Sequence, residues 1–186
     1  DSEFRLQVRS SLSQLQFRVY GWSGPRDIEL RFTAHVPAEV AIAVAPEMIG
    51  FEMVGDTVQE ETGRRASTVV VRPTANAAES IVAFNHDPYP RVLPPSPLVA
   101  GPNQTSGGLR LVRTGYNGGV LGILAEGLPG QTYTLRVATP WNVSQVTGVP
   151  GARVTAFAEG IATISVTIPG SGSRYRPIDL EVSFAR

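Results

Sequence analysis

The chain has 186 residues, of which 42% are hydrophobic and 17% are charged, so it is apolar enough to fold and too poor in charge to be disordered. Sixteen basic residues balance sixteen acidic ones, and this zero net charge disfavours nucleic acids and anionic membranes as partners. Cysteine is absent, which excludes disulfides, thiolate metal sites and thiol nucleophiles and fits a bacterial protein. No apolar run approaches the roughly 18 residues that a membrane-spanning helix needs.

Strict alternation of apolar and polar residues predicts half-buried strands from the start of the chain. Phe4, Leu6 and Val8 alternate with polar residues, and the same pattern recurs over residues 15–22 and 28–36. Short runs rich in β-branched residues predict further strands at 40–44, 68–71 and 80–84. We expect the polar run 56–65 to be an exposed loop.

A proline-rich stretch divides the chain, because residues 88–102 hold six prolines and almost no hydrophobic pattern. Beyond it, short apolar runs predict seven more strands, at 109–112, 120–125, 132–137, 143–146, 153–158, 161–168 and 178–184. We therefore predict an all-β, antiparallel β-sandwich protein made of two tandem immunoglobulin-like sandwiches, residues 1–90 and 108–186, joined by a linker or crossover at 91–107. One large sandwich is the alternative. The halves share no visible sequence repeat, so we predict no duplication.

The loop Ser23-Gly24-Pro25-Arg26 is the first candidate for a functional site. If it joins two antiparallel strands, three pairs face each other on the outer surface: Trp22 with Asp27, Tyr20 with Glu29, and Arg18 with Arg31. Exposed rings flanked by carboxylate and guanidinium groups are typical of carbohydrate-binding β-modules. The alternative is that another domain covers these rings, since Tyr and Trp are also favoured at interfaces.

Other candidates for chemistry have structural alternatives. Asn85-His86-Asp87 pairs an imidazole with a carboxylate at a strand end, which suits a metal or a general base but also suits a turn. Asp56, Glu60 and Glu61 supply oxygens for calcium without the spacing of a known calcium loop. His35, the other histidine, is expected to be solvated, and no nucleophile or phosphate-binding motif is present. We therefore predict a non-catalytic protein without a cofactor or metal.

Trp141 follows a predicted strand in the second half, where it either binds a ligand or closes one end of the core. Three segments of this half carry a resemblance. They are Gly130-Gln131-Thr132-Tyr133-Thr134-Leu135-Arg136-Val137, Thr139-Pro140-Trp141 and Tyr175-Arg176-Pro177-Ile178-Asp179-Leu180-Glu181-Val182. Through them, residues 109–186 resemble the C-terminal β-sandwich accessory modules of secreted bacterial carbohydrate-active enzymes. Some of those modules bind polysaccharide and others only support a catalytic domain, and they have no catalytic residues to carry over.

The resemblance implies a secreted or cell-surface bacterial protein whose partners are a polysaccharide or oligosaccharide and a parent catalytic domain. We accordingly predict a carbohydrate-binding or accessory module, with a site formed by Arg18, Tyr20, Trp22, Asp27, Glu29 and Trp141. The alternative is a structural or protein-interaction sandwich, such as an adhesin or spacer domain. In that case an edge strand such as 163–168 would pair with a strand of the partner.

Overall fold

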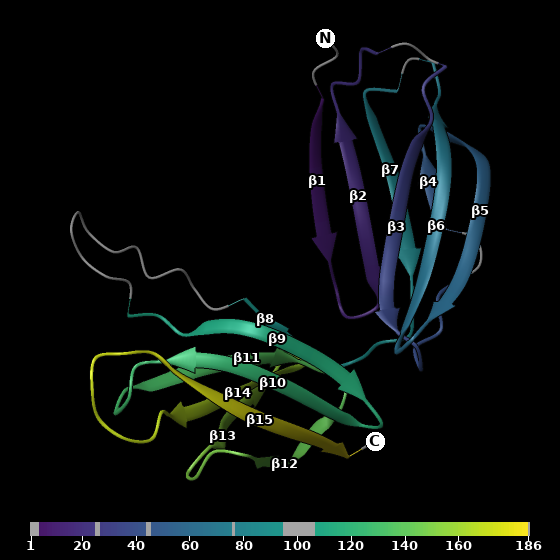
Figure 1. The fold of residues 1–186 in the computed structure, drawn as a ribbon. Helices are drawn as coiled ribbons and strands as arrows, with labels where there is room; N and C mark the ends of the chain where they lie inside the picture. The colour runs from purple at the N-terminus through teal and green to yellow at the C-terminus, as the bar shows by residue number, and fades with distance from the viewer. Residues whose placement is uncertain (1–3, 25–26, 44–45, 76, 95–106, 186) are drawn as a thin grey trace. The chain divides into compact units, whose positions relative to one another are not determined.

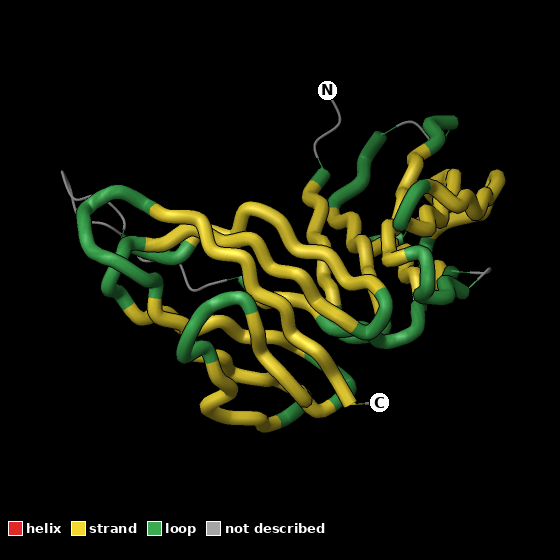
Figure 2. The backbone as a smooth tube through the Cα atoms, turned by 60° about the horizontal axis from the view of Figure 1, so that its bottom comes forward, coloured by secondary structure: helices red, strands yellow, loops and turns green. Residues whose placement is uncertain are grey.

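All strand pairings among the residues that the computed structural model describes are antiparallel (Figure 1). The structure describes residues 4–24, 27–43, 46–75, 77–94 and 107–185, and these form strands, turns and loops (Figure 2). They divide into two compact units, residues 1–88 and 89–186. The predicted all-β, antiparallel fold class is confirmed. Within the described ranges no helix long and apolar enough to cross a membrane occurs.

The first unit contains one sheet in the order β1-β2-β7-β4 and a second in the order β3-β6-β5 (Figure 1). Its strands are β1 (Arg5–Ser10), β2 (Gln14–Tyr20), β3 (Leu30–Pro37), β4 (Glu47–Ile49), β5 (Phe51–Glu61), β6 (Arg64–Pro73) and β7 (Glu79–Asn85). Phenylalanines from both sheets meet between them: the ring centroid of Phe17 in β2 lies 5.2 Å from that of Phe32 in β3 and 6.0 Å from that of Phe84 in β7. The alternating apolar residues therefore form a core between the two sheets.

Gly50 is the point at which the chain passes from one sheet of the first unit to the other. It is the single residue between β4 and β5, and its φ is 71°. A Cβ atom at this position would lie 2.7 Å from Ser80 Oγ and 2.9 Å from the Glu79 carbonyl oxygen. Only glycine combines this left-handed conformation with so close an approach to β7.

The second unit contains the sheets β12-β15-β10-β9 and β13-β14-β11-β8. Its strands are β8 (Arg91–Leu93), β9 (Arg110–Asn117), β10 (Val120–Gly127), β11 (Thr132–Ala138), β12 (Asn142–Thr147), β13 (Arg153–Ala158), β14 (Ile161–Thr167) and β15 (Arg176–Ala185). The core between its sheets is mainly aliphatic, and Ile123, Leu135, Ile164 and Leu180 are almost completely buried.

The two units have the same strand order. Adding eight to the strand numbers of the first unit converts its sheets β1-β2-β7-β4 and β3-β6-β5 into β9-β10-β15-β12 and β11-β14-β13, and every pairing is antiparallel in both. Gly148, which follows β12, even matches Gly50: its φ is 95°, and a Cβ there would lie 2.1 Å from the Asp179 carbonyl oxygen of β15. Strand β8, beside β11, is the addition in the second unit.

This strand order is not that of an immunoglobulin domain. An immunoglobulin domain places its fifth strand beside its second. Here the seventh strand, β7, takes that place and the fifth strand, β5, lies in the opposite sheet. The sequence could not distinguish the two arrangements, because period-2 alternation identifies strands but not their neighbours.

Several expected local structures were wrong. Strands β2 and β3 do not form a hairpin, because β2 pairs with β1 and β7 while β3 pairs with β6 in the other sheet. The polar run 56–65 is not a loop but the β5–β6 hairpin, closed by Thr62 and Gly63. Residues 91–93, expected in the linker, form β8, and β14 is an inner strand rather than an edge. Within the expected strand 40–44, Ile42 forms only an isolated bridge with His86.

Candidate functional site

Arg18 and Tyr20 lie on the outer surface of the sheet β1-β2-β7-β4. They alternate with Phe17 and Val19, whose side chains point into the core, so the alternation of β2 turns Arg18 and Tyr20 outward. Residues paired across antiparallel strands share a face, so Gln7 and Glu79 lie on this surface as well. We call this surface the polar face, and define it by Gln7, Gln14, Gln16, Arg18, Tyr20, Glu47, Glu79 and Asn85.

Side-chain hydrogen bonds connect neighbours on the polar face across all four strands. The Arg18 guanidinium donates from Nη1 to Glu79 Oε1 at 2.9 Å and from Nε to Gln16 Oε1 at 2.7 Å. The Tyr20 hydroxyl donates to Gln7 Oε1 at 3.1 Å. Gln14 donates to Asn85 at 2.8 Å, and Asn85 in turn donates to Glu47 at 3.2 Å. These bonds hold amide, guanidinium and carboxylate groups in fixed positions on a flat surface.

The charge of Arg18 is supported by its neighbours. Its pKa is raised above the usual value, mainly by a hydrogen bond with Tyr20, which together with the Glu79 carboxylate outweighs the opposing effect of desolvation. Its side chain and that of Glu79 are both partly exposed, at 26% and 39%. A ligand on the polar face would therefore meet a fixed cation and a fixed anion side by side.

Trp22 does not share the face of Tyr20. The chain turns at Gly21, whose φ is 66°, and this turn ends the alternation of β2. The half-buried Trp22 ring instead contacts Phe4, with 5.3 Å between the ring centroids.

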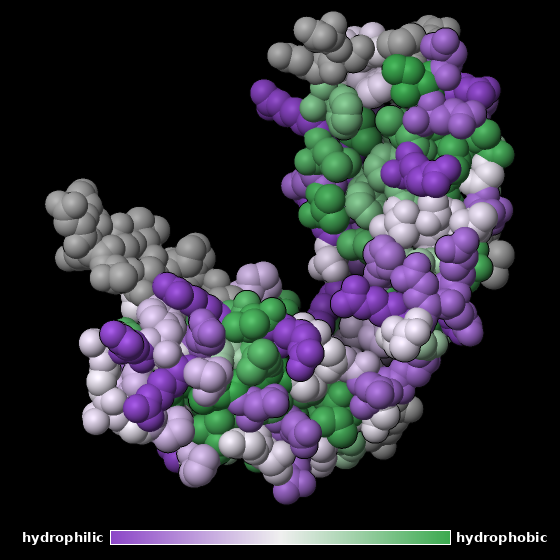
Figure 3. Space-filling model, viewed as in Figure 1, coloured by the Kyte–Doolittle hydropathy of each residue, from purple (hydrophilic) through white to green (hydrophobic). Residues whose placement is uncertain are grey.

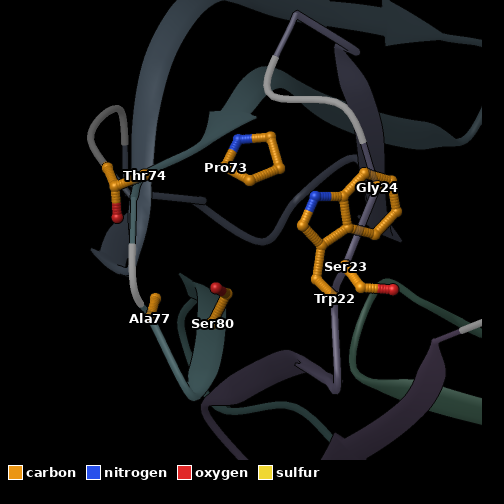
Figure 4. A pocket seen from close by; sticks show the side chains of 7 residues that line it. All are labelled: Trp22, Ser23, Gly24, Pro73, Thr74, Ala77 and Ser80. Atoms are coloured by element: carbon orange, nitrogen blue, oxygen red, sulfur yellow. The ribbon is translucent and has the colours of Figure 1, made fainter. Parts of the chain in front are cut away.

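Trp22 lines a small pocket of about 250 Å³, at the end of β2 and the start of β7 (Figure 4). The lining residues are Trp22, Ser23, Gly24, Pro73, Thr74, Ala77 and Ser80. Figure 4 shows the indole nitrogen on the side of the ring that faces Pro73. The indole Nε1 is buried and has no hydrogen-bond partner among the described residues. Ser80 pairs with Val19 on the core side of the sheet, so the pocket lies at the same end of β2 and β7 as Tyr20 and Glu79 but on the side opposite the polar face.

Asp27 and Glu29 lie elsewhere than the sequence predicted. Both are exposed in the connection from β2 to β3, and the Glu29 carboxylate forms an ion pair with Arg72 of β6 at 3.3 Å. No hairpin pairs them with Tyr20 or Trp22, since β2 and β3 belong to different sheets. Glu79 supplies the carboxylate beside Arg18 instead.

Trp141 belongs to the second unit, where it packs in an aromatic cluster. Its ring stacks on Tyr116 with 6.2 Å between centroids and an interplanar angle of 28°, and lies 6.4 Å from Phe184. The Thr139 hydroxyl bonds both the amide and the carbonyl of Trp141, at 3.0 and 2.9 Å. Trp141 is thus partly buried against the core of the second unit.

The His86 and Asp87 side chains bond the backbone around them. His86 Nδ1 lies 2.8 Å from the Asp87 carbonyl oxygen, and the Asp87 carboxylate accepts a hydrogen bond from the Ala41 amide at 3.4 Å. Of the calcium candidates, Glu60 forms an ion pair with Arg65 at 2.6 Å. In the described part of the chain, no cluster of three or more histidine and acidic side chains could hold a metal ion.

Sequence reasoning missed the residues that strand pairing brings from far along the chain. Glu79 is 61 positions from Arg18, and Asn85 is 71 positions from Gln14. The sequence offers one indication of them: the polar residues Glu79 and Asn85, at the two ends of the run 79–85, are an even number of positions apart and so share one face of a strand. Comparison of the chain with protein-family models, with curated proteins and with solved structures gave no match.

Proposed function

We propose that this chain is a non-catalytic carbohydrate-binding module, with the polar face and the Trp22 pocket of the first unit as its site. The observation that carries the proposal is the buried Trp22 indole N–H, which lacks an acceptor among the described residues and belongs to a ring that lines a small pocket at the end of β2 and the start of β7. A buried donor without a partner costs about 1–3 kcal/mol. A ligand oxygen that accepted this hydrogen bond would recover that cost.

The dimensions of the pocket favour a small polar ligand group. Its volume of about 250 Å³ lies just below the roughly 300–1,000 Å³ of pockets that hold drug-sized ligands. Ser23, Thr74 and Ser80 contribute hydroxyl groups, which both donate and accept hydrogen bonds. A sugar ring has complementary groups, because its hydroxyls also do both and its CH face packs against an indole. The pocket is thus suited to a single sugar residue.

The polar face would bind the next residues of the glycan. Arg18, Glu79 and the amides present charged and neutral partners for hydroxyls, and Tyr20 presents a partly exposed ring beside them. In this proposal the second unit is the accessory part, in keeping with its resemblance to modules of secreted bacterial carbohydrate-active enzymes. A secreted or cell-surface location and a parent catalytic domain belong to the same proposal.

Affinity gel electrophoresis against a panel of soluble polysaccharides tests this function. At least one polysaccharide should retard the protein, and Trp22→Ala and Arg18→Ala should each weaken binding by about tenfold or more, equivalent to roughly 1.4 kcal/mol. Trp22→Phe keeps a ring and removes the N–H, so it isolates the hydrogen bond. Arg110→Ala, in the second unit, is the matched control and should bind as the unaltered protein does. No retardation on the whole panel, or full binding by Trp22→Ala, would contradict the proposal.

A further inference from the structure

Strand β8 of the second unit has no counterpart among the described residues of the first. It pairs antiparallel with β11 over residues 91–93, and β11 corresponds to β3 in the first unit. In the described part of the first unit, β3 pairs on one side only, with β6. The backbone groups on its other side form an open sheet edge.

In the second unit, β8 also covers part of the inner side of β9, where Tyr116 is buried and Thr114 stays exposed. It contacts β9, and Tyr89, just before β8, stacks on Tyr116 of β9 with 6.3 Å between ring centroids. Tyr116, which also stacks on Trp141, is only 7% exposed, and Val92 of β8 packs against the core. One short strand thus extends a sheet and covers part of one side of the sandwich.

In the first unit the apolar side chains on the inner side of β1 are exposed. Leu6 and Val8 of β1 pair with Val19 and Phe17, so they point to the inner side of their sheet. Yet Leu6 is 51% and Val8 52% exposed, whereas their partner Val19 is 1% exposed. Figure 3 shows apolar side chains gathered over β1 of this unit. Strand β1 therefore extends beyond the facing sheet, over the place that β8 occupies in the second unit.

The edge strands on this side of the first unit, β1 and β3, lack the protective features of the other edge strands. Natural proteins protect sheet edges with bulges or with very short strands. The edge strands β5, β9, β12 and β13 each contain an unpaired extra residue, respectively Val54, Val112, Ser144 and Thr155. The edge strands β4 and β8 have three residues each. Strands β1 and β3 pair regularly over six and eight residues, and they flank the unfilled place.

We propose that an extended segment of another polypeptide docks along the free edge of β3, antiparallel to it, and inserts apolar side chains at alternate positions beneath Leu6 and Val8. The mode is strand addition, in which backbone hydrogen bonds give affinity and alternate side chains give specificity. Arg31 and His35 lie exposed on the outer side of β3, so acidic residues at the outward positions of the segment suit this edge.

A second copy of the chain is a poorer occupant. Each strand of the described residues already has a place in a sheet, so a second copy would have to release one of its own strands to fill the edge. A segment that is extended and unpaired before binding has no such cost. This interaction surface does not depend on the proposed sugar site, since it uses β3 and the inner side of β1 rather than the polar face.

Selection from a phage-displayed library of random peptides of about nine residues tests the proposal with the complete 186-residue chain. Enriched peptides should alternate apolar and polar residues, and a synthetic copy should slow hydrogen exchange of the β3 amides. The double variant Leu6→Glu, Val8→Glu should weaken its binding by about tenfold or more. The control is Ile49→Glu, on the exposed edge strand β4, which should bind normally.

Three results would overturn the proposal. They are no enrichment over the unselected library, binding that survives the double variant while the β3 amides stay unprotected, and a dimer in light scattering that the double variant dissociates. The last result would assign the surface to a second copy. Retention of polysaccharide binding by the double variant would show that the two sites fail independently.

Discussion

The two units of this protein share one strand order but fill and close it differently. The first has a core of contacting phenylalanines from both sheets, and its β1 side is open. The second has a mainly aliphatic core, and β8 with Tyr89 closes the equivalent side. The strand order is thus compatible with quite different side chains, provided that apolar residues alternate and a glycine stands where the chain changes sheets.

The largest effect should come from the phenylalanine core of the first unit. Phe84→Ala should lower the free energy of unfolding of this unit by about 3–5 kcal/mol, since Phe84 is fully buried and contacts Phe17. The sequence has two tryptophans, one in each unit, so Trp22 fluorescence in a Trp141→Phe background reports on the first unit alone. Ile49→Ala, at an exposed position, is the control. A loss below about 1 kcal/mol would contradict the buried position of Phe84.

The glycines that carry the chain between sheets should be the next most sensitive. Gly148→Ala forces a Cβ within 2.1 Å of the Asp179 carbonyl oxygen at a φ of 95°, and should cost about 2–5 kcal/mol in chemical denaturation. Gly50→Ala should cost somewhat less, because its nearest neighbour is the movable Ser80 hydroxyl. Gly115→Ala, in open space on β9, should change stability by less than about 0.5 kcal/mol. Equal losses at Gly148 and Gly115 would remove the argument for sheet-switching glycines.

Removal of the β8 cover should make the second unit resemble the first. Val92→Glu places a charge against the core and should cost about 1–2 kcal/mol, the smallest of the three effects because Val92 is only partly buried. Trp141, which stacks on Tyr116, reports the change by fluorescence, and an apolar dye should bind the newly exposed surface. Val112→Glu, at a 55% exposed position in β9, should behave as the unaltered protein does. If Val112→Glu also lowered the stability, the loss caused by Val92→Glu could not be assigned to β8.

The sequence was sufficient for the fold class, because strands that face a core must alternate. It did not reveal which strands pair with one another. A run such as 15–22 predicts a strand, but nothing within it shows that residue 85 rather than residue 30 lies beside it. The turn at Gly21 and the long connection to β3 place the two neighbouring strands of the expected hairpin in different sheets. Three-residue strands such as β4 and β8 are too short to show any period, and β5 read as a loop because it is exposed along almost all of its length.

The candidate site could be predicted only in part. Arg18 and Tyr20 were placed correctly on an outer surface, because their positions follow from the alternation of β2 alone. Glu79, Gln7 and Asn85 required knowledge of the pairing between distant segments. The repeated strand order of the two units was also invisible, since what the units share is the spacing of apolar positions and two glycines rather than residue identities.

The pairing of β2 with β7 also determines when the first unit can form during synthesis. Gln14 bonds Asn85, so the central strands of this sheet come from opposite ends of the unit. During synthesis the β1–β2 hairpin emerges before its partner β7, so Phe17 and Val19 stay in water until β7 follows. Contacts between such distant residues slow folding and prolong the exposure of apolar strands.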